Sequence, residues 1–147
     1  MPVRLRTRGL DRRPVRPADL RWRAEAMLAA LGVEDSELSI LLCDDSTIRE
    51  LNRRYRNKNR ATDVLAFPMQ EGPGPQFAQG LLGDVVISLP TARRQAAASD
   101  RAIVDEVTFL LAHGLLHLLG HDHATARQER EMTARTEALM AAVEAAR

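Results

Sequence analysis

All four histidines of this 147-residue chain fall between positions 113 and 123. His113 and His117 are four positions apart, so on a helix they project from the same face, one turn apart. Gly120 follows, and a glycine there can adopt a positive φ, end the helix and turn the chain back. The sequence therefore predicts a helix end at which several imidazole rings converge.

Imidazoles at this spacing favour a zinc site. His113 and His117 would supply two nitrogens from the helix, and either His121 or His123 could supply a third from the returning segment. We favour His123, because a histidine three residues after the glycine is typical of zinc sites built from a helix and a glycine turn. Three protein ligands leave one position open on zinc, as in catalytic sites. A structural or pH-sensitive histidine cluster is the alternative.

Length and composition suit one globular domain over residues 1–147. Hydrophobic residues make up 45% of the chain but aromatic residues only 3%, so the core must be mainly aliphatic. The single cysteine, Cys43, excludes an internal disulfide and fits a reducing compartment, and we interpret it as a buried strand residue. No apolar run reaches the roughly 20 residues of a membrane span, and no secretory signal is recognisable. We therefore expect a cytoplasmic protein without membrane association.

The hydrophobic pattern predicts the element order β-α-β-α-β-β-α-α-α, which is an α+β domain with one mixed four-stranded sheet. Strands are expected at 3–6, 37–43, 64–67 and 82–89. Helices are expected at 18–31, 47–54, 90–98, 101–119 and 124–145. Residues 70–80 are rich in glycine and proline and are expected to form a mobile excursion.

The helix expected at 101–119 carries His113 and His117 and is apolar nearly all round, which is typical of a helix at the centre of a domain. The two histidines should therefore lie at the floor of a cleft, on a rigid support. Asp100 is expected to cap this helix. Glu106 lies on the histidine face, where it could orient a metal ligand or simply be an acid near a helix start.

The net charge is only +1, but the charges are unevenly distributed along the chain. Residues 1–60 carry 14 basic and 9 acidic side chains, whereas residues 61–147 carry 7 basic and 11 acidic ones. The excess is greatest in a basic loop expected at 53–60, which is either a solvated face or a phosphate-binding surface. Its five cations are expected to follow an RNA backbone rather than to read sequence: Arg53, Arg54, Arg56, Lys58 and Arg60.

The residue after the first histidine argues against peptide hydrolysis. Zinc proteases with this histidine spacing have a glutamate there, which acts as general base. Here the position is Gly114, which cannot accept a proton and is expected to open room beside the metal. A phosphodiester substrate needs cations to stabilise charge on the phosphoryl oxygens, and the basic loop would supply them if the fold brings it near.

Three segments occur in an order that resembles a known family. They read Arg-Asn-Lys-Asn-Arg-Ala-Thr-Asp-Val-Leu-Ala-Phe-Pro at 56–68, Gly-Asp-Val-Val-Ile-Ser at 83–88 and His-Gly-Leu-Leu-His-Leu-Leu-Gly-His-Asp-His at 113–123. Together they resemble the YbeY family of bacterial endoribonucleases and rRNA maturation factors, over roughly residues 40–140. The resemblance implies a metal-dependent enzyme, usually with zinc, that cuts single-stranded RNA. It also implies roles in 16S rRNA 3′-end maturation and ribosome quality control, with the small ribosomal subunit as partner and ribosomal proteins or assembly GTPases as further candidates.

The resemblance also implies roles for individual residues. The metal ligands map onto His113, His117 and His123, and the functional arginine onto Arg56, as a contact to the scissile phosphate. These four residues are the catalytic candidates. The chain departs from the usual family pattern at four positions, with Asn59 for aspartate, Ala61 for proline, Ala66 for serine and His121 for tyrosine.

Three functions remain open at this point: a zinc-dependent endoribonuclease, a small zinc protease, and a non-catalytic ribosome-assembly module whose zinc locks a loop. Gly114 and the basic loop favour the first over the second, but the sequence separates the first from the third poorly. Whether water or the 2′-hydroxyl of RNA attacks is also open. The candidates for a general base are Asp63, Asp84, His121 and Asp122, of which Asp63 and Asp84 are better explained as structural residues at strand ends.

Overall fold

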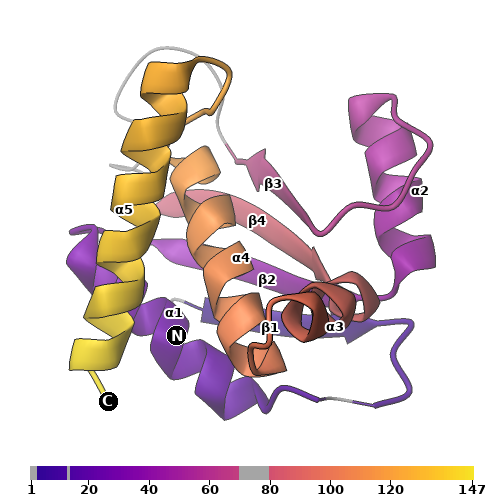
Figure 1. Cartoon of the computed structure of the whole chain (residues 1–147), viewed down its shortest axis with the longest axis horizontal. Coiled ribbons are helices and arrows are strands. Elements are labelled where there is room, and N and C mark those ends of the chain that lie inside the picture. The colour runs from indigo at the N-terminus through magenta and orange to yellow at the C-terminus, as the bar shows by residue number, and fades with distance from the viewer. Residues whose placement is uncertain (1–2, 13, 70–79) are drawn as a thin grey trace.

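The computed structural model describes residues 3–12, 14–69 and 80–147 (Figure 1). Within them the elements are β1 (Val3–Arg8), α1 (Pro17–Ala30), β2 (Glu37–Cys43), α2 (Asp45–Arg56), β3 (Val64–Pro68), β4 (Leu81–Ser88), α3 (Leu89–Ala98), α4 (Ile103–Leu118) and α5 (Ala126–Ala145). This is the predicted order, and most ends lie within two residues of those expected. The excursion expected at 70–80 lies outside the described residues, except for Gly80.

The four strands form one mixed sheet in the order β1-β2-β4-β3. The pairs β1–β2 and β2–β4 are parallel, whereas β3 runs antiparallel to β4. Parallel neighbours need a crossover connection, and α1 provides it between β1 and β2. The predicted α+β class with a mixed four-stranded sheet is therefore confirmed.

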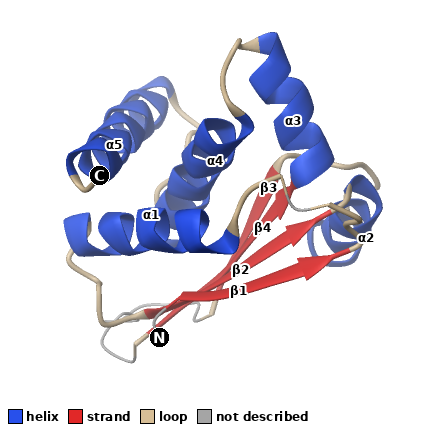
Figure 2. Cartoon of the chain, turned by 90° about the horizontal axis from the view of Figure 1, so that it is seen from below, coloured by secondary structure: helices blue, strands red, loops and turns tan. Residues whose placement is uncertain are grey.

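The two faces of the sheet are covered unequally. Helices α1, α4 and α5 lie on one face, over the main hydrophobic core (Figure 2). On the opposite face, which we call the open face, α2 packs over a small cluster of Cys43, Ile48 and Val86. This cluster covers only the part of the open face where β2 and β4 meet α2. The part of the open face toward β1 therefore remains accessible.

Helix α4 is the central helix of the domain, as predicted, and ten of its sixteen residues are buried. Asp100 does not cap it. The backbone N–H groups of Asp105 and Glu106 bond to the carbonyl of Ala102, whereas Asp100, with φ 51°, belongs to the turn that ends α3. None of the described helices is both long and apolar enough to cross a membrane.

The segment expected as a basic loop at 53–60 begins inside a helix. Asp44 caps α2 by accepting a hydrogen bond from the backbone N–H of Thr47, 2.9 Å long. The helix continues to Arg56 and ends at Asn57, which has left-handed φ and ψ of 57° and 36°. Arginine is a good helix former, and cations are favourable near a helix C-terminus, so the arginines extend α2 beyond its expected end.

Candidate metal centre

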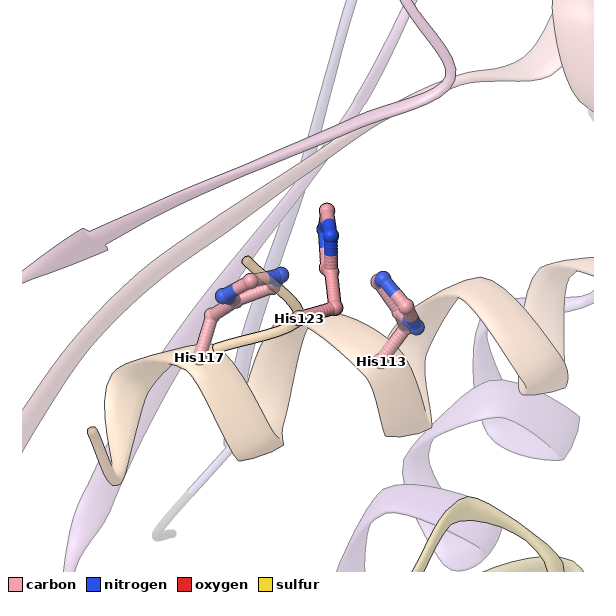
Figure 3. Close-up of side chains that lie close together, drawn as sticks. All are labelled: His113, His117 and His123. Carbon is pink, nitrogen blue, oxygen red and sulfur yellow. The ribbon is translucent and has the colours of Figure 1, made fainter. Parts of the chain in front are cut away.

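Three histidines meet at the end of α4. His113 and His117 lie in its last two turns, Gly120 turns the chain with a φ of 95°, and His123 returns toward them. Each ring offers a nitrogen, and these three atoms all lie within 4.8 Å of one another. Figure 3 shows the rings of His113, His117 and His123 gathered on one side of the helix. The ring centroids are 5.1–5.7 Å apart.

This donor set fits a zinc ion. Three imidazole nitrogens around one point, with no fourth ligand in the group among the described residues, match the composition of a catalytic zinc site. His121 is not a member of the group, although it lies only two residues from His123. The structure therefore brings together the three histidines that we favoured as ligands, while their metal binding stays a prediction.

Burial favours the neutral, metal-binding form of two of these rings. Desolvation lowers the pKa of His113, and the neighbouring His117 and His123 lower it further. Desolvation also lowers the pKa of His117, with a smaller contribution from the charge of Arg56. Because an imidazole must be neutral to bind a metal, both shifts keep the rings in the binding form at neutral pH.

Phe109 is a neighbour of the site that the sequence interpretation missed. Its ring stacks on that of His113, with centroids 6.3 Å apart. The sequence could have indicated this contact, because Phe109 lies one helical turn before His113. The guanidinium of Arg101 lies 5.3 Å from the centroid of the Phe109 ring and donates a 3.1 Å hydrogen bond to Glu106. Glu106 therefore pairs with Arg101 and is not seen to orient a metal ligand.

Gly114 is buried where α4 packs against the sheet. A side chain there would meet Val85 of β4 and Val64 of β3. This close approach seats the helix that carries the histidines directly on the sheet. Gly114 also lines a cavity of about 240 Å³ together with His113, His117 and His123, so it leaves room beside the candidate metal ligands, as expected.

Arg56 lies beside the histidines although it comes from the other face of the sheet. Its guanidinium donates a hydrogen bond to the carbonyl of Ala66 and lies 5.1 Å from the ring centroid of Phe67. A cavity of about 560 Å³ places it with Lys58, His117 and other residues, among them His121 and Asp122. The fold therefore brings two of the five predicted RNA-binding cations to the histidine cluster.

The other three cations are placed differently. Arg53 pairs with Glu50 on the surface of α2. Arg53, Arg54 and Arg60 line none of the cavities beside the histidines. Their contact with RNA remains a prediction.

The four candidates for a general base occupy three different places. Asp63 accepts hydrogen bonds from Gln95 and from the backbone N–H of Val64, 3.1 and 2.7 Å long, which supports its structural interpretation. Asp84 lines a groove on the open face. Only His121 and Asp122 line the cavity that holds Arg56.

Comparison with known proteins points to one family. The YbeY family model, described as endoribonuclease YbeY, matches residues 16–144. A protein named endoribonuclease YbeY from Anaeromyxobacter dehalogenans is 55% identical over 130 residues, which cover 84% of this chain and 65% of the relative. A protein of the same name from Aquifex aeolicus is 47% identical over 120 residues, covering 82% of this chain and 78% of the relative. The chain spans just under two thirds of the Anaeromyxobacter relative.

A solved structure agrees in fold alone. The solution structure of TM1509 from Thermotoga maritima matches with a TM-score of 0.64 and 23% identity, and the match covers 95% of this chain and 88% of that one. The family match extends from the start of α1 almost to the end of α5 and includes all three clustered histidines and Arg56. Because the match takes in nearly the whole fold and its candidate metal centre, this chain is a member of the YbeY family.

Proposed function

We propose that this chain is a zinc-dependent endoribonuclease that cuts single-stranded RNA, with one zinc ion per chain. The observation that carries the proposal is the convergence of three imidazoles beside a cavity that Arg56 lines. The names of the relatives support it. We further propose that it matures the 3′ end of 16S rRNA and acts in ribosome quality control, with the small ribosomal subunit as its cytoplasmic partner.

His113, His117 and His123 would hold the ion. When bound, zinc polarises a phosphoryl oxygen and lowers the pKa of a bound water toward about 7. The lowered pKa values of His113 and His117 keep these ligands neutral without a competing proton. Because α4 is the most deeply buried helix of the fold, two of the three ligands have a rigid support.

Arg56 is proposed to bind the scissile phosphate. Its contacts with Ala66 and Phe67 hold the guanidinium over the edge of the sheet, and it shares a cavity with His117. A planar guanidinium can contact two phosphoryl oxygens at once and stabilise the negative charge that grows on them during cleavage. Lys58 lines the same cavity and adds a second positive charge.

Proton transfer is assigned to the same cavity. His121 and Asp122 line it, whereas Asp84 lines a groove elsewhere. Asp63 lines a neighbouring cavity with the three histidines, but both its oxygens accept hydrogen bonds, from Val64 and Gln95. We therefore narrow the general base to His121 or Asp122. The attacking oxygen belongs either to water or to the 2′-hydroxyl of the RNA. Water leaves a 5′-phosphate, and the 2′-hydroxyl leaves a 2′,3′-cyclic phosphate, so end-group analysis of the products distinguishes them.

The experiment is metal analysis of the purified protein together with an RNA cleavage assay before and after chelation. We expect one zinc per chain, cleavage that stops with chelator and returns with added zinc, and specificity for single strands. Stoichiometric zinc without RNA cleavage would favour a non-catalytic assembly module, and peptide hydrolysis without RNA cleavage a protease. Cleavage by metal-free protein would show that the metal has no part in the reaction.

A further inference from the structure

Strand β1 presents a row of arginines on the open face of the sheet. Val3 and Leu5 point into the core, so the alternate residues Arg4, Arg6 and Arg8 point the other way, and all three are exposed. Residues two apart on a strand are about 6.6 Å apart, which gives a regular line of positive charge. Among the described residues, Arg6 and Arg8 take part in no ion pair.

A groove of about 530 Å³ runs from these arginines to α2. In the strand register Arg6 of β1 lies beside Leu41 of β2, and Leu41 lies beside Val86 of β4. Leu41 and Val86 therefore form an apolar floor between Arg6 and α2. The C-terminal half of α2 forms the far wall. Three arginines and one acid line the groove, namely Arg6, Arg8, Arg56 and Asp84. Its charge therefore suits a polyanion.

An exposed aromatic ring stands at this groove. Tyr55 lines it and is 59% exposed, which is unusual for a large apolar side chain. Its ring meets that of Phe67 edge to face, with centroids 5.5 Å apart and an angle of 68°. This contact fixes the ring while leaving much of it accessible. Exposed aromatic rings among arginines are the elements with which proteins hold single-stranded nucleic acids.

Arg56 belongs to both the groove and the metal centre. It lines the groove with Arg6 and Tyr55, and it also lines the cavity that contains His117. An RNA strand whose scissile phosphate lies at Arg56 can therefore continue directly across the open face. The groove and this cavity share Arg56 and Pro68, so they lie next to each other.

We propose that this groove binds the nucleotides that flank the cleavage point in single-stranded RNA. Arg6 and Arg8 contact successive phosphates, and a base stacks on Tyr55. The inference rests on the proposed endoribonuclease function and extends it to a binding track. Strand β1 precedes the residues 16–144 that match the family model, so its arginines are a feature of this chain outside that match.

The test compares the wild type with the double variant Arg6→Ala/Arg8→Ala in metal-free, chelator-treated protein, where RNA binds but is not cut. The affinity for labelled RNA of about 16 and about 4 nucleotides, which brackets the site sizes of single-strand-binding folds, is measured at several salt concentrations. The matched control is Arg130→Ala/Arg135→Ala, which removes the same charge from exposed positions on α5. Thermal denaturation checks that each variant is folded, and Arg6→Gln/Arg8→Gln replaces the alanine variant if that one unfolds.

We expect the double variant to bind the long RNA at least tenfold more weakly, with unchanged binding of the short RNA and no effect in the control. Losing two phosphate contacts should reduce the slope of log K against log salt by about 1.4. Tyr55→Ala should weaken long-RNA binding about tenfold, whereas Tyr55→Phe should retain it, because stacking needs only the ring.

If both the arginine and the Tyr55 variants kept the affinity for RNA and the salt slope of the wild type, the proposed binding track would be wrong. This result is expected if the groove binds a protein partner instead. If Arg56→Ala still weakened RNA binding in that case, the proposed function would survive without the track. If the wild type bound no RNA of either length, the proposed function and the track would both fail.

Discussion

A Cβ atom at Gly114 would lie 2.7 Å from Cγ1 of Val85, so α4 and β4 approach each other more closely there than any side chain allows. Replacing Gly114 by alanine should therefore push the helix away from the sheet, despite the higher helix propensity of alanine. We expect the free energy of unfolding to fall by about 1–3 kcal/mol, the usual cost of overpacking. We also expect weaker zinc binding, because His113 is the adjacent residue. Chemical denaturation and metal titration measure the two effects.

The control for this prediction is the same substitution in a Val85→Ala background. Removing the valine methyl groups makes space, so Gly114→Ala should cost much less there than in the wild type. Equal costs in both backgrounds would show that the contact with Val85 does not decide the effect.

Removing single histidines should separate ligands from bystanders. In His113→Ala, His117→Ala and His123→Ala proteins, added zinc should no longer raise the melting temperature, because each lacks one of the three converging nitrogens. In the wild type, free zinc at 100 times its Kd should add about 2.7 kcal/mol to the free energy of unfolding. His121→Ala serves as the control and should keep the response. Loss of the response in His121→Ala but not in His123→Ala would mean that the third ligand is misassigned.

Arg56→Ala should reduce the rate of RNA cleavage by about 100-fold while leaving the zinc content unchanged, because we propose that the arginine acts on the substrate phosphate and not on the metal. Arg56→Lys should recover only part of the activity, since an ammonium cannot contact two oxygens in one plane. Single-turnover cleavage and metal analysis on the same preparations provide both values. Full activity of Arg56→Ala would remove this residue from the mechanism.

Asp45 should make the stability of the fold depend on pH. Burial alone would raise its pKa, but hydrogen bonds from Ser88, Thr91 and Arg94 outweigh burial and hold the pKa below its usual value. A carboxyl whose pKa is lowered by folding adds stability above its unfolded pKa and loses it as the pH falls through the folded pKa. Asp45→Asn should therefore lower the free energy of unfolding by about 1–2 kcal/mol at pH 7.

The same comparison at low pH is the internal control. The stability that the ionised carboxyl adds is lost as the pH falls from about 4, the usual unfolded value, through the lower folded pKa, so urea denaturation should show the two proteins converging over this range. A difference that stays constant from pH 7 to pH 3 would mean that the charge of Asp45 is not what stabilises the fold.

Cys43 should be inert in the folded protein. It is fully buried, and burial, with the nearby charges of Asp44 and Asp45, raises its pKa to about 12. The thiolate that reacts with alkylating reagents is therefore nearly absent at neutral pH. Mass spectrometry after alkylation should show no labelled chain under native conditions and one label in denaturant. Rapid native labelling would contradict the buried placement of this strand.

The sequence predicted the element order, the mixed sheet and the central helix, because aliphatic residues are spaced at strand and helix periods throughout the chain. Helix ends were harder to place. Asp100 looked like a cap by residue type, but its backbone completes the turn after α3. The helix expected at 47–54 ends two residues too early, because the helix propensity of the arginines and the left-handed Asn57 extend α2 to Arg56.

The candidate site could be predicted only where its residues are neighbours in the chain. The three histidines lie on one helix and the turn that follows, so their spacing alone indicated a metal centre. The place of Arg56 beside them depends on β3 and β4 pairing, which no local pattern reveals. The close packing of Gly114 against Val64 and Val85 could not be predicted for the same reason, since these residues are distant in sequence.

The unequal covering of the sheet has a dynamic consequence. Helix α4 has ten buried residues, whereas α2 has only two, Ile48 and Asn52. Amide hydrogens of α2 should therefore exchange with solvent through local opening long before those of α4. The proposed active centre would then join two parts of different stiffness: histidines on the most firmly anchored helix, and Arg56 at the end of a helix that we expect to open more readily.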